Sequence, residues 1–529
     1  MVNKKSGALL PLLFSLVLVT GIGIGYELRD QSTGLGFFGS STKTPLEDVL
    51  NLVKKRYVDP VSIDSINNAL VEDVLSHLDP HSAYIPSADR NEANEELMGN
   101  FQGIGIEYEI LNDTVNVMHV IKDGPSEKAG IEVGDELIKA DDSIHLSGNK
   151  ISSEDIRKRL RGPQGSSVKI TVLRNGKPKN IIIERGNIPL PSVDVAYVIA
   201  PQTGYIHLNK FSQRTYEEFM QALEKLQKQG IKKLILDLRG NGGGLMSEAV
   251  SIADEFLDND KLIVYTQGYH SPREEYHCQK EGLFETGQLV VLVDETSASA
   301  SEILAGALQD WDRATIIGRR SFGKGLVQQP FTLSNGGELR LTVARYYTPV
   351  GRNIQKPYNK GKDEYMEELY NRFHDGEVTV GDTSSKPKGH AFKTKGGHIV
   401  YGGGGITPDI FVAYDTSSTK STTGKLQYKG TLSTFVYKWF VSNKQRFMAV
   451  QNLQQLQQAS IMGNSEWQLL NRMAAKDSIA LNNLSAKDKV LIQQKVEALM
   501  ARQVWDTDKY FEVANKTDEI VQKALSVLK

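Results

Sequence analysis

The chain has 529 residues, of which 40% are hydrophobic and 24% are charged, and its formal net charge is −2 at pH 7. This length predicts several domains, and the near-neutral charge gives no electrostatic case for binding nucleic acid. Cys278 is the only cysteine, which excludes an intrachain disulfide, and no His/Cys/Asp cluster has the spacing of metal ligands, so we expect neither a metal nor an organic cofactor.

The first segment, 1–30, is predicted to target the chain for export. Lys4 and Lys5 precede an uncharged stretch, 6–26. Because about 20 apolar residues cross a bilayer, this stretch suits either a signal peptide or a single membrane span. The lack of a clear cleavage site favours a signal anchor, with the remaining chain on the periplasmic side of the inner membrane. Release after signal cleavage is the alternative.

Residues 43–98 are predicted to form a helical N-terminal region, because apolar residues recur there at helical spacing on both sides of Pro60. The sequence LDPHS, residues 78–82, then breaks the pattern. We expect His77 and His81 to be structural rather than catalytic.

Residues 99–187 are predicted to form a small β-rich domain. The stretch GPSEKAGIEVGDELIKADD resembles a PDZ domain, with RGPQGSSVKITVLRNGK as its closing helix and strand. Such domains add a peptide's C-terminus as a strand to a sheet edge and hold its carboxylate with backbone N–H groups. The resemblance implies that Gly103, Ile104, Gly105 and Ile106 form the carboxylate loop. A strand entry with a bulge is the alternative for the two glycines.

Strands and helices alternate after residue 191. Strands are predicted at 205–208 and 233–238, with an amphipathic helix between them at 215–228 and another helical stretch at 245–257. The glycine run RGNGGG, residues 239–244, connects the second strand to that last helix. It lacks the GK[ST] of a Walker loop and the G-x-G-x-x-G of a dinucleotide loop.

A serine-rich turn follows the next predicted strand, 290–293. The sequence SASAS, residues 297–301, stands where this strand gives way to a helix, so a hydroxyl there would lie beside the free N–H groups of the first helical turn. Ser299 and Glu302 also fit an S-x-x-E capping box, which would be a purely structural role. Downstream, Lys324 lies between two glycines. Burial would lower its pKa and let it accept a proton from a serine, whereas an exposed turn lysine is the alternative.

SASASEILAGALQD followed by SFGKGLVQ resembles the C-terminal processing peptidases, also called tail-specific proteases. The resemblance implies that Ser299 is the nucleophile, Lys324 the general base and Gln328 the residue that orients the lysine. Both motifs are present without substitution and in the family's order.

DLRGNGGG is similar to the DLRxNxGG segment of the same family. This implies an oxyanion hole formed by the N–H of Ala300 and that of Gly243 or Gly244. The family more often has proline or serine at position 242, so the sequence leaves open which glycine points inward.

The resemblance implies an α+β multidomain fold with a PDZ domain, a crotonase/Clp-like α/β serine peptidase core, and helical N- and C-terminal regions. The core would span 191–355 and 404–415. The intervening segment, 356–403, is rich in Lys, Gly, Ser and charged residues and is predicted to be a surface loop or mobile flap. The resemblance does not extend to the polar helical region 425–529, which we expect to be an ordinary packed subdomain.

These features predict a serine endopeptidase that cleaves exported proteins near their C-termini through an acyl-enzyme. Expected partners are polypeptides with free C-termini, an adaptor protein, the membrane through the N-terminal segment, and a second copy of the chain, since LDPHS resembles a region that supports dimerisation or the PDZ domain. Arg161 could report ligand occupancy to the peptidase, as in relatives, or be a surface arginine. The alternatives are a crotonase-like thioester enzyme and a non-catalytic PDZ scaffold.

Overall fold

The structure is a computed structural model of the chain. It describes residues 15, 17, 19–21, 44–142, 144–148, 151–380, 389–414, 421–482 and 484–529. The chain divides into two units, Met1–Leu70 and Val71–Lys529. Most of the predicted targeting segment, 1–30, lies outside the described residues. Within the part that the structure describes, no helix combines the length and apolarity that a bilayer span requires.

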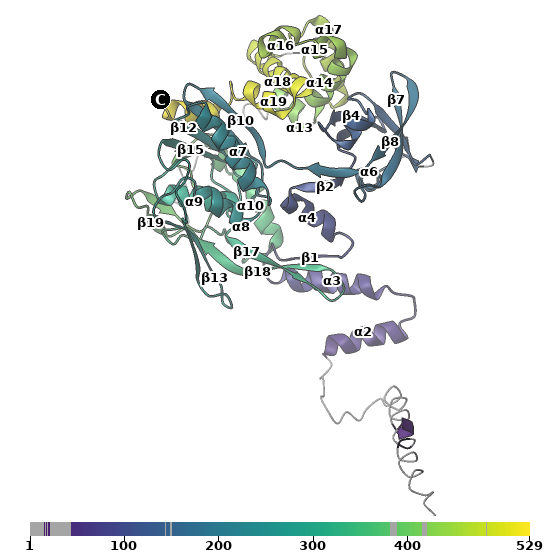
Figure 1. The fold of residues 1–529 in the computed structure, drawn as a ribbon, viewed down its shortest axis with the longest axis vertical. Coiled ribbons are helices and arrows are strands. Elements are labelled where there is room, and N and C mark those ends of the chain that lie inside the picture. Colours follow the sequence, from purple (N-terminus) through teal and green to yellow (C-terminus); the bar gives the residue numbers. More distant parts are fainter. Residues whose placement is uncertain are drawn as a thin grey trace, which may run out of the picture. The chain divides into compact units, whose positions relative to one another are not determined.

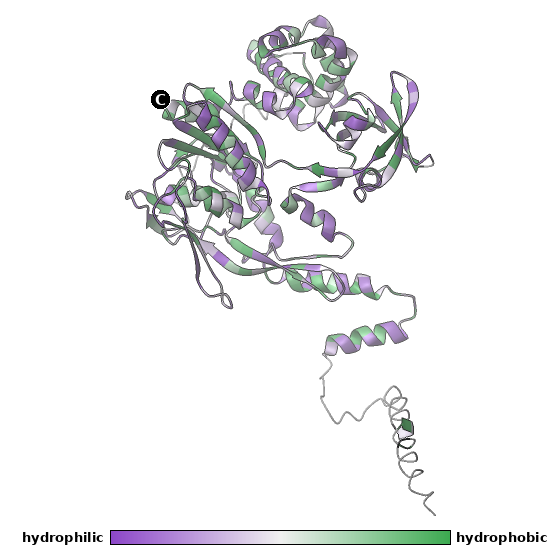
Figure 2. Ribbon diagram, viewed as in Figure 1, coloured by the Kyte–Doolittle hydropathy of each residue, from purple (hydrophilic) through white to green (hydrophobic). Residues whose placement is uncertain are grey.

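The N-terminal region contains two amphipathic helices, α2 (Pro45–Arg56) and α3 (Ile63–Ser76), whose hydrophobic and hydrophilic residues alternate along the ribbon (Figure 2). Thr44 and Glu47 form a capping box at the start of α2, and Pro45 occupies the first turn, where its missing N–H costs nothing. Further along, β1 (Ala83–Ile85) and α4 (Arg90–Met98) lead to the β-rich domain.

The β-rich domain contains a six-stranded antiparallel sheet in the order β3-β4-β5-β7-β8, with β6 paired to β5. Alternating apolar residues of these strands and two residues of α6 form its core. A short ribbon of β2 and β9 connects the domain to its neighbours. The elements are β2 (Asn100–Gly103), β3 (Ile106–Leu111), β4 (Thr114–Val120), α5 (Pro125–Ala129), β5 (Glu136–Ala140), β6 (Ile144–His145), α6 (Ser153–Leu160), β7 (Ser167–Arg174), β8 (Lys177–Glu184) and β9 (Gly186–Pro189).

A second six-stranded sheet, in the order β10-β11-β12-β15-β16-β21, forms the centre of the α/β core (Figure 1). Its strands are parallel except for β10, which pairs antiparallel with β11. Parallel strands need covered faces, and one face packs under α7, α8 and α9. The elements are β10 (Val193–Ala200), β11 (Thr203–Leu208), α7 (Thr215–Lys228), β12 (Lys233–Asp237), α8 (Met246–Ala253), β15 (Gln288–Val293), α9 (Ala300–Asp310), β16 (Thr315–Gly318) and β21 (Ile410–Phe411).

A separate antiparallel sheet carries the segment that follows Lys324. It has the order β1-β18-β13-β14, with β17 paired to β18. The elements are β13 (Leu262–Gln267), β14 (Glu274–His277), β17 (Leu326–Thr332) and β18 (Glu338–Tyr347).

The inserted segment 356–403 differs from the predicted surface loop or mobile flap in the part that the structure describes. It contains α10 (Lys362–His374), α11 (Glu377–Val380) and a two-stranded ribbon of β19 (Ala391–Lys393) and β20 (Ile399–Tyr401). Tyr365 and Arg372 are buried on α10. The described residues of this segment belong to none of the hydrophobic core clusters, and Arg372 binds backbone carbonyls of the peptidase core.

The C-terminal region is helical, and α13 to α19 gather in one group (Figure 1) around a core that contains Phe435, Trp439 and Phe440. Ser485 and Asp488 form a capping box at the start of the 20-residue helix α18. The last helix packs on the second face of the core sheet. The elements are α13 (Thr422–Tyr428), α14 (Thr431–Ser442), α15 (Lys444–Met448), α16 (Leu453–Ala459), α17 (Asn464–Lys476), α18 (Ala486–Trp505), α19 (Thr507–Ala514) and α20 (Glu519–Val527).

Candidate active site

Ser299 lies at the sharp corner between β15 and α9, as the sequence pattern predicts. Its backbone has φ 54° and ψ −112°, a conformation that favours glycine and costs roughly 1–3 kcal/mol at a functional site. The corner leaves the side chain half-buried at the N-terminus of a helix whose other residues are all buried. A strained, accessible hydroxyl at a helix N-terminus is suited to nucleophilic attack.

The capping-box alternative for Ser299 holds only for its backbone. The Glu302 carboxylate accepts a hydrogen bond from the Ser299 N–H at 2.9 Å, but the Ser299 side chain makes no cap hydrogen bond in this part of the structure. The Glu302 N–H donates to the Ser299 carbonyl instead, at 2.8 Å. The hydroxyl is therefore not committed to stabilising the helix.

Lys324 lies in the loop between β16 and β17, and its amine donates to the Gln328 side-chain oxygen at 3.0 Å. Burial lowers the pKa of Lys324, while the negative charges of Glu302 and Asp79 oppose that shift and Arg340 adds to it. Loss of solvent disfavours the charged amine, so a larger fraction of it is neutral near pH 7 than for an exposed lysine. Such an amine can accept a proton from a serine.

Glu302 is hydrogen-bonded to the backbones of both Ser299 and Lys324. The residue is 1% exposed, and its carboxylate accepts hydrogen bonds from the N–H groups of Ser299, Gly323 (2.7 Å) and Lys324 (2.8 Å), as well as from the Ser321 hydroxyl. Burial raises the pKa of Glu302, although the four donors favour its charged form. The sequence pattern indicated only a cap for this residue and missed its bond to the lysine loop.

Tyr346 of β18 makes a second link between the same two residues. Its buried hydroxyl donates to the Lys324 carbonyl and lies 3.2 Å from the Ser299 carbonyl oxygen. The backbones of Ser299 and Lys324 are thus held on their N–H sides by Glu302 and on their carbonyl sides by Tyr346. No motif in the sequence indicated this tyrosine.

Gln328 connects the lysine to the segment LDPHS. While its side-chain oxygen accepts from Lys324, its amide donates to the His81 carbonyl. Burial lowers the pKa of His81 to about 4, and the positive charge of Lys324 adds to the shift, so the imidazole is neutral near pH 7. His81 donates to or accepts from the Tyr365 hydroxyl at 2.7 Å. The exposed His77 lies 4.0 Å from Asp73.

The glycine loop lies directly against Ser299. A Cβ at Gly243 would lie 2.7 Å from the Ser299 Cβ and 3.0 Å from the Ala300 nitrogen, so only glycine fits there. The Gly243 N–H donates to the Asn241 side chain at 2.9 Å. Among the hydrogen bonds of the described residues, the N–H groups of Gly244 and Ala300 have no protein acceptor.

Two further serines of SASAS hold this loop in place. The Ser297 hydroxyl donates to the Leu238 carbonyl at 2.8 Å, and the Ser301 hydroxyl donates to the Asn241 carbonyl at 3.0 Å. The glycine loop and the serine corner are therefore one hydrogen-bonded unit, with unoccupied donors beside the Ser299 side chain.

The predicted carboxylate loop of the β-rich domain lies at the start of its edge strand, β3. Ile104 is buried, Gly105 has φ 76°, and Ile106 begins β3, which pairs with β4 on one side only in the described sheet. The N–H groups of Ile104 and Gly105 have no protein acceptor in this part of the structure. Gly103 ends β2 and pairs with Gly186.

Arg161 follows α6 and is not a free surface arginine. Its guanidinium donates to Glu95 of α4 at 2.5 Å and lies 4.8 Å above the Phe101 ring. It therefore connects α4 to the β2 strand that leads into the carboxylate loop.

Comparison with known proteins identifies two parts of the chain. Residues 202–361 match the model of peptidase family S41, and residues 102–184 match the PDZ domain. A "Carboxy-terminal-processing protease" of Bartonella bacilliformis is 35% identical over 353 residues, 65% of this chain and 79% of the relative. A "Probable CtpA-like serine protease" of Staphylococcus aureus is 32% identical over 359 residues, 67% of this chain and 71% of the relative.

Among solved structures, the photosystem II D1 C-terminal processing protease is 30% identical, with a TM-score of 0.35, over 59% of this chain and 84% of that chain. The family models place the PDZ domain before the peptidase in the chain. The predicted family, fold class and peptidase activity are confirmed, and the chain belongs to peptidase family S41 as a serine peptidase with a PDZ domain.

Proposed function

We propose that this peptidase cleaves exported polypeptides near their C-termini, with Ser299 as nucleophile, Lys324 as general base and Gln328 as the residue that orients the base. One observation supports this assignment most strongly: the buried Glu302 carboxylate binds the N–H groups of both Ser299 and Lys324. Residues 25 positions apart in the sequence are thereby joined at a single anchor. Ser299, Lys324 and Gln328 also lie in the two motifs that resemble those of the family, SASASEILAGALQD and SFGKGLVQ.

In the proposed reaction, neutral Lys324 takes the proton of the Ser299 hydroxyl as its oxygen attacks the scissile carbonyl carbon. The carbonyl oxygen becomes an oxyanion beside the N–H groups of Ala300 and Gly244. The lysine then gives its proton to the departing amine as the C–N bond breaks, which leaves an acyl-enzyme. The same lysine then takes a proton from a water molecule, whose oxygen attacks the acyl carbon. The ester bond to Ser299 breaks, the acid leaves, and the lysine returns the proton to the Ser299 oxygen.

We assign the second oxyanion donor to Gly244 because the Gly243 N–H is already bound to Asn241. Each donor of this kind contributes roughly 3–4 kcal/mol to the transition state. Gly243 has a different role, because a residue without a side chain allows the loop to contact Ser299.

For the PDZ domain we propose binding of the substrate's C-terminus along the open edge of β3. The free N–H groups of Ile104 and Gly105 suit a terminal carboxylate, and the substrate would continue as an added strand. Export to the periplasmic side of the membrane follows from the character of residues 1–30 and remains part of this proposal. An adaptor protein or a second copy of the chain could regulate access.

The proposal predicts that Ser299→Ala and Lys324→Ala each abolish cleavage of an unfolded reporter protein with an apolar free C-terminus. Neither substitution removes a side chain of the hydrophobic core, so the circular dichroism spectrum of each variant should match that of the wild type. Proteomics of C-termini in cells with wild type against the Ser299→Ala variant would identify the trimmed proteins. Turnover by the lysine variant close to the wild-type rate would contradict the assigned base.

An amidated reporter tests the PDZ assignment separately. Blocking the terminal carboxylate should raise KM, because the N–H groups of the carboxylate loop lose their charged acceptor. Equal KM values for the free-acid and amidated reporters would rule out recognition of the C-terminus by this loop, even if Ser299 and Lys324 prove to be catalytic.

A further inference from the structure

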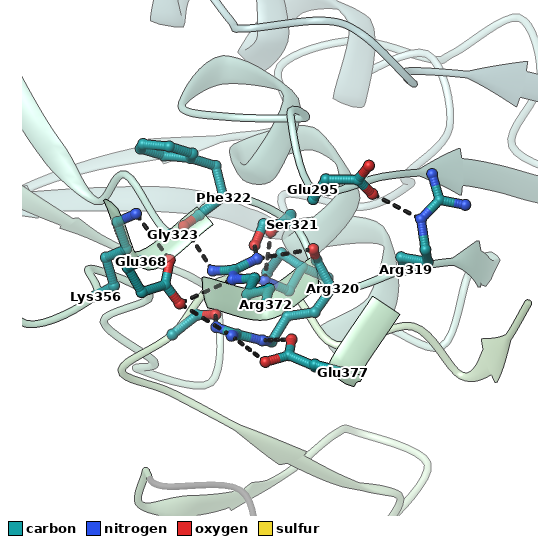
Figure 3. Close-up of polar contacts among 12 residues, drawn as sticks. Glu295, Arg319, Arg320, Ser321, Phe322, Gly323, Lys356, Glu368, Arg372 and Glu377 are labelled. Carbon is teal, nitrogen blue, oxygen red and sulfur yellow. Dashed lines mark hydrogen bonds and ion pairs between the residues drawn. The ribbon is translucent and has the colours of Figure 1, made fainter. Parts of the chain in front are cut away.

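The inserted helix α10 lies against the chain segment that leads into Lys324. Figure 3 shows Arg372 of α10 among Arg320, Ser321, Phe322 and Gly323, with dashed lines that mark its contacts to this segment. Sequence composition indicated a loop without a core here, so this packing requires its own explanation.

Arg372 binds three consecutive carbonyl oxygens. Its guanidinium donates to the carbonyls of Arg320 (3.2 Å), Ser321 (2.8 Å) and Phe322 (3.1 Å), and the whole residue is 3% exposed. A planar guanidinium carries five donors in a fixed geometry, so it can hold such a run where a lysine amine cannot. The three carbonyls end two residues before Lys324.

The opposite edge of the same loop is held by Glu302, which accepts from the N–H groups of Gly323 and Lys324. The loop 320–324 is therefore bound by a buried cation on its carbonyls and by a buried carboxylate on its N–H groups. The carboxylate belongs to the family's serine helix, whereas the cation comes from the inserted segment.

Partly buried acidic residues balance the charges of Arg372 and of its neighbour Arg320. Glu368, one turn earlier on α10, accepts from Arg372 at 2.8 Å and from Lys356 at 2.9 Å, and it lies 3.2 Å from Arg320 (Figure 3). Glu377 of α11 accepts two hydrogen bonds from Arg320. Because desolvation of the charged groups offsets their attraction, such a network adds little to the stability of the fold. Its effect here is to fix the positions of the side chains that it joins.

A second route connects α10 to the lysine. Tyr365 is 2% exposed, and its hydroxyl is 2.7 Å from the His81 imidazole. The His81 carbonyl accepts from Gln328, whose oxygen accepts from the Lys324 amine. The Tyr365 ring also packs edge-on against Phe322, the residue whose carbonyl Arg372 binds.

We propose that α10 positions the catalytic lysine, with Arg372 and Tyr365 as positioning residues that act through the loop 320–324 and through His81 and Gln328. The inference rests on Lys324 being the general base, as proposed above. An insertion in the peptidase core would then be a working part of the active site rather than a surface appendage.

The test uses Arg372→Lys, Tyr365→Phe and the matched control Tyr370→Phe in the full chain. Tyr370 is on the same helix but 65% exposed, so its hydroxyl should have no part in the site. The activity of each variant on a fluorogenic peptide with an apolar free C-terminus would be followed from pH 6 to 10 beside wild type and Lys324→Ala. Thermal unfolding of each variant would check the fold.

We expect Arg372→Lys and Tyr365→Phe to lower kcat by about 10- to 100-fold with little change in KM, because small displacements of a catalytic group have effects of this size. A loosened loop would admit water to Lys324, so the pH at which activity rises should move upward. The charged groups facing this amine, Glu302, Asp79 and Arg340, remain unchanged in these variants. Tyr370→Phe should behave as wild type.

The inference is overturned if Tyr365→Phe and Arg372→Lys keep wild-type kcat and pH dependence, or lose activity equally at every pH. If Arg372→Lys fails to fold, the result for Tyr365→Phe alone tests the inference, because this variant loses only one hydroxyl and keeps the packed ring. Full activity in Lys324→Ala would instead overturn the proposed function, so the two failures are distinguishable.

Discussion

A single carboxylate at position 302 is bonded to four groups of the site. Its two oxygens accept three N–H donors and one hydroxyl in a cavity closed to solvent. A neutral amide in the same place would have one acceptor oxygen and would turn an NH₂ group toward donors. Such a clash of donors leaves buried polar groups unsatisfied, each at a cost of roughly 1–3 kcal/mol.

Glu302→Gln is therefore expected to lower kcat by about 100-fold, because the backbones of Ser299 and Lys324 lose their common anchor. The variant should still fold, since α9 keeps its buried apolar residues. Steady-state kinetics with a peptide reporter would measure the loss, and Glu217→Gln on the exposed side of α7 is the control. Wild-type kcat in Glu302→Gln would show that the anchor is dispensable.

The lowered pKa of Lys324 predicts the pH dependence of the reaction. Burial moves this pKa below the ordinary 10.5, and only the deprotonated amine can act as base. Activity should therefore rise with pH through the pKa of Lys324 and level off above it. The pH profile of kcat/KM for the free enzyme reports this value. Lys324→Arg, which stays charged at all accessible pH, should be inactive throughout, and activity in that variant would contradict the proposed proton transfer.

At the scale of elements, the strand-to-helix units of the core agree closely with prediction. The helix predicted at 215–228 is α7 with the same bounds, and the strand predicted at 233–238 is β12, one residue shorter. A helix that packs on a sheet has apolar residues at helical spacing, and a buried strand of that sheet is an unbroken apolar run. Both elements can therefore be predicted from the sequence.

Helix α10 shows where this information ends. Its apolar residues Met366, Tyr370 and Phe373 are exposed, whereas its buried residues are Tyr365 and the charged Arg372. Apolar spacing does not identify the buried face of such a helix, because its packing depends on carbonyls and carboxylates elsewhere in the sequence. Similarly, the link from Tyr346 to Ser299 and Lys324 depends on the pairing of β18 with β13, where Tyr346 is opposite Thr266. The motifs themselves indicated the serine and the lysine but none of these supports.

The last helix, α20, is joined to the catalytic region by an ion pair. Arg239, which opens the glycine loop, donates to Asp518 at 2.9 Å while it also binds the fully buried Asp237. Asp518 is at the same time the N-cap of α20, because its carboxylate accepts from the Val521 N–H. Asp518 thus serves the helix and the loop together.

Asp518→Asn should separate these two roles. Asparagine caps a helix as well as aspartate does, so the variant loses only the charge that faces Arg239. We expect a loss of about 1–3 kcal/mol in unfolding free energy, measured as a lower thermal midpoint. Asp518→Ala also removes the cap and should unfold at a lower temperature still. Equal midpoints for Asp518→Asn and wild type would show that the ion pair adds nothing.

At the scale of the whole molecule, the C-terminal helices contact the PDZ domain through charged pairs. Arg502 of α18 donates twice to Glu107 of β3, and Lys444 donates to Glu132. His119 of β4 lies 3.5 Å from Asp506, between α18 and α19. The hydrogen bond to Asp506 raises the pKa of His119, and the same bond lowers the pKa of Asp506 to about 2.

This pair predicts a pH window of stability. His119, with its raised pKa, stabilises the fold below its unfolded value of about 6.5 and loses that contribution as pH rises through the folded value. Asp506, with its lowered pKa, contributes above about pH 3.8 and loses the contribution as pH falls toward 2. The thermal midpoint of wild type should therefore exceed that of His119→Gln most between about pH 4 and 6.5. A constant difference from pH 4 to 9 would rule the pair out as its source.

Asp506 stands between two helices that contact different parts of the molecule. Before it, Arg502 of α18 binds Glu107 of β3 in the PDZ domain, whereas after it the Phe511 ring of α19 lies 4.6 Å from the His207 ring of the core sheet, measured between centroids. The backbone at Asp506 has φ 89°, which ends one helix and starts the next without a loop. Because Val513 of α19 also lies in the core that these helices share, α19 links the helices that contact the PDZ domain to the sheet that carries the serine. A displacement of the recognition domain would reach that sheet through α19.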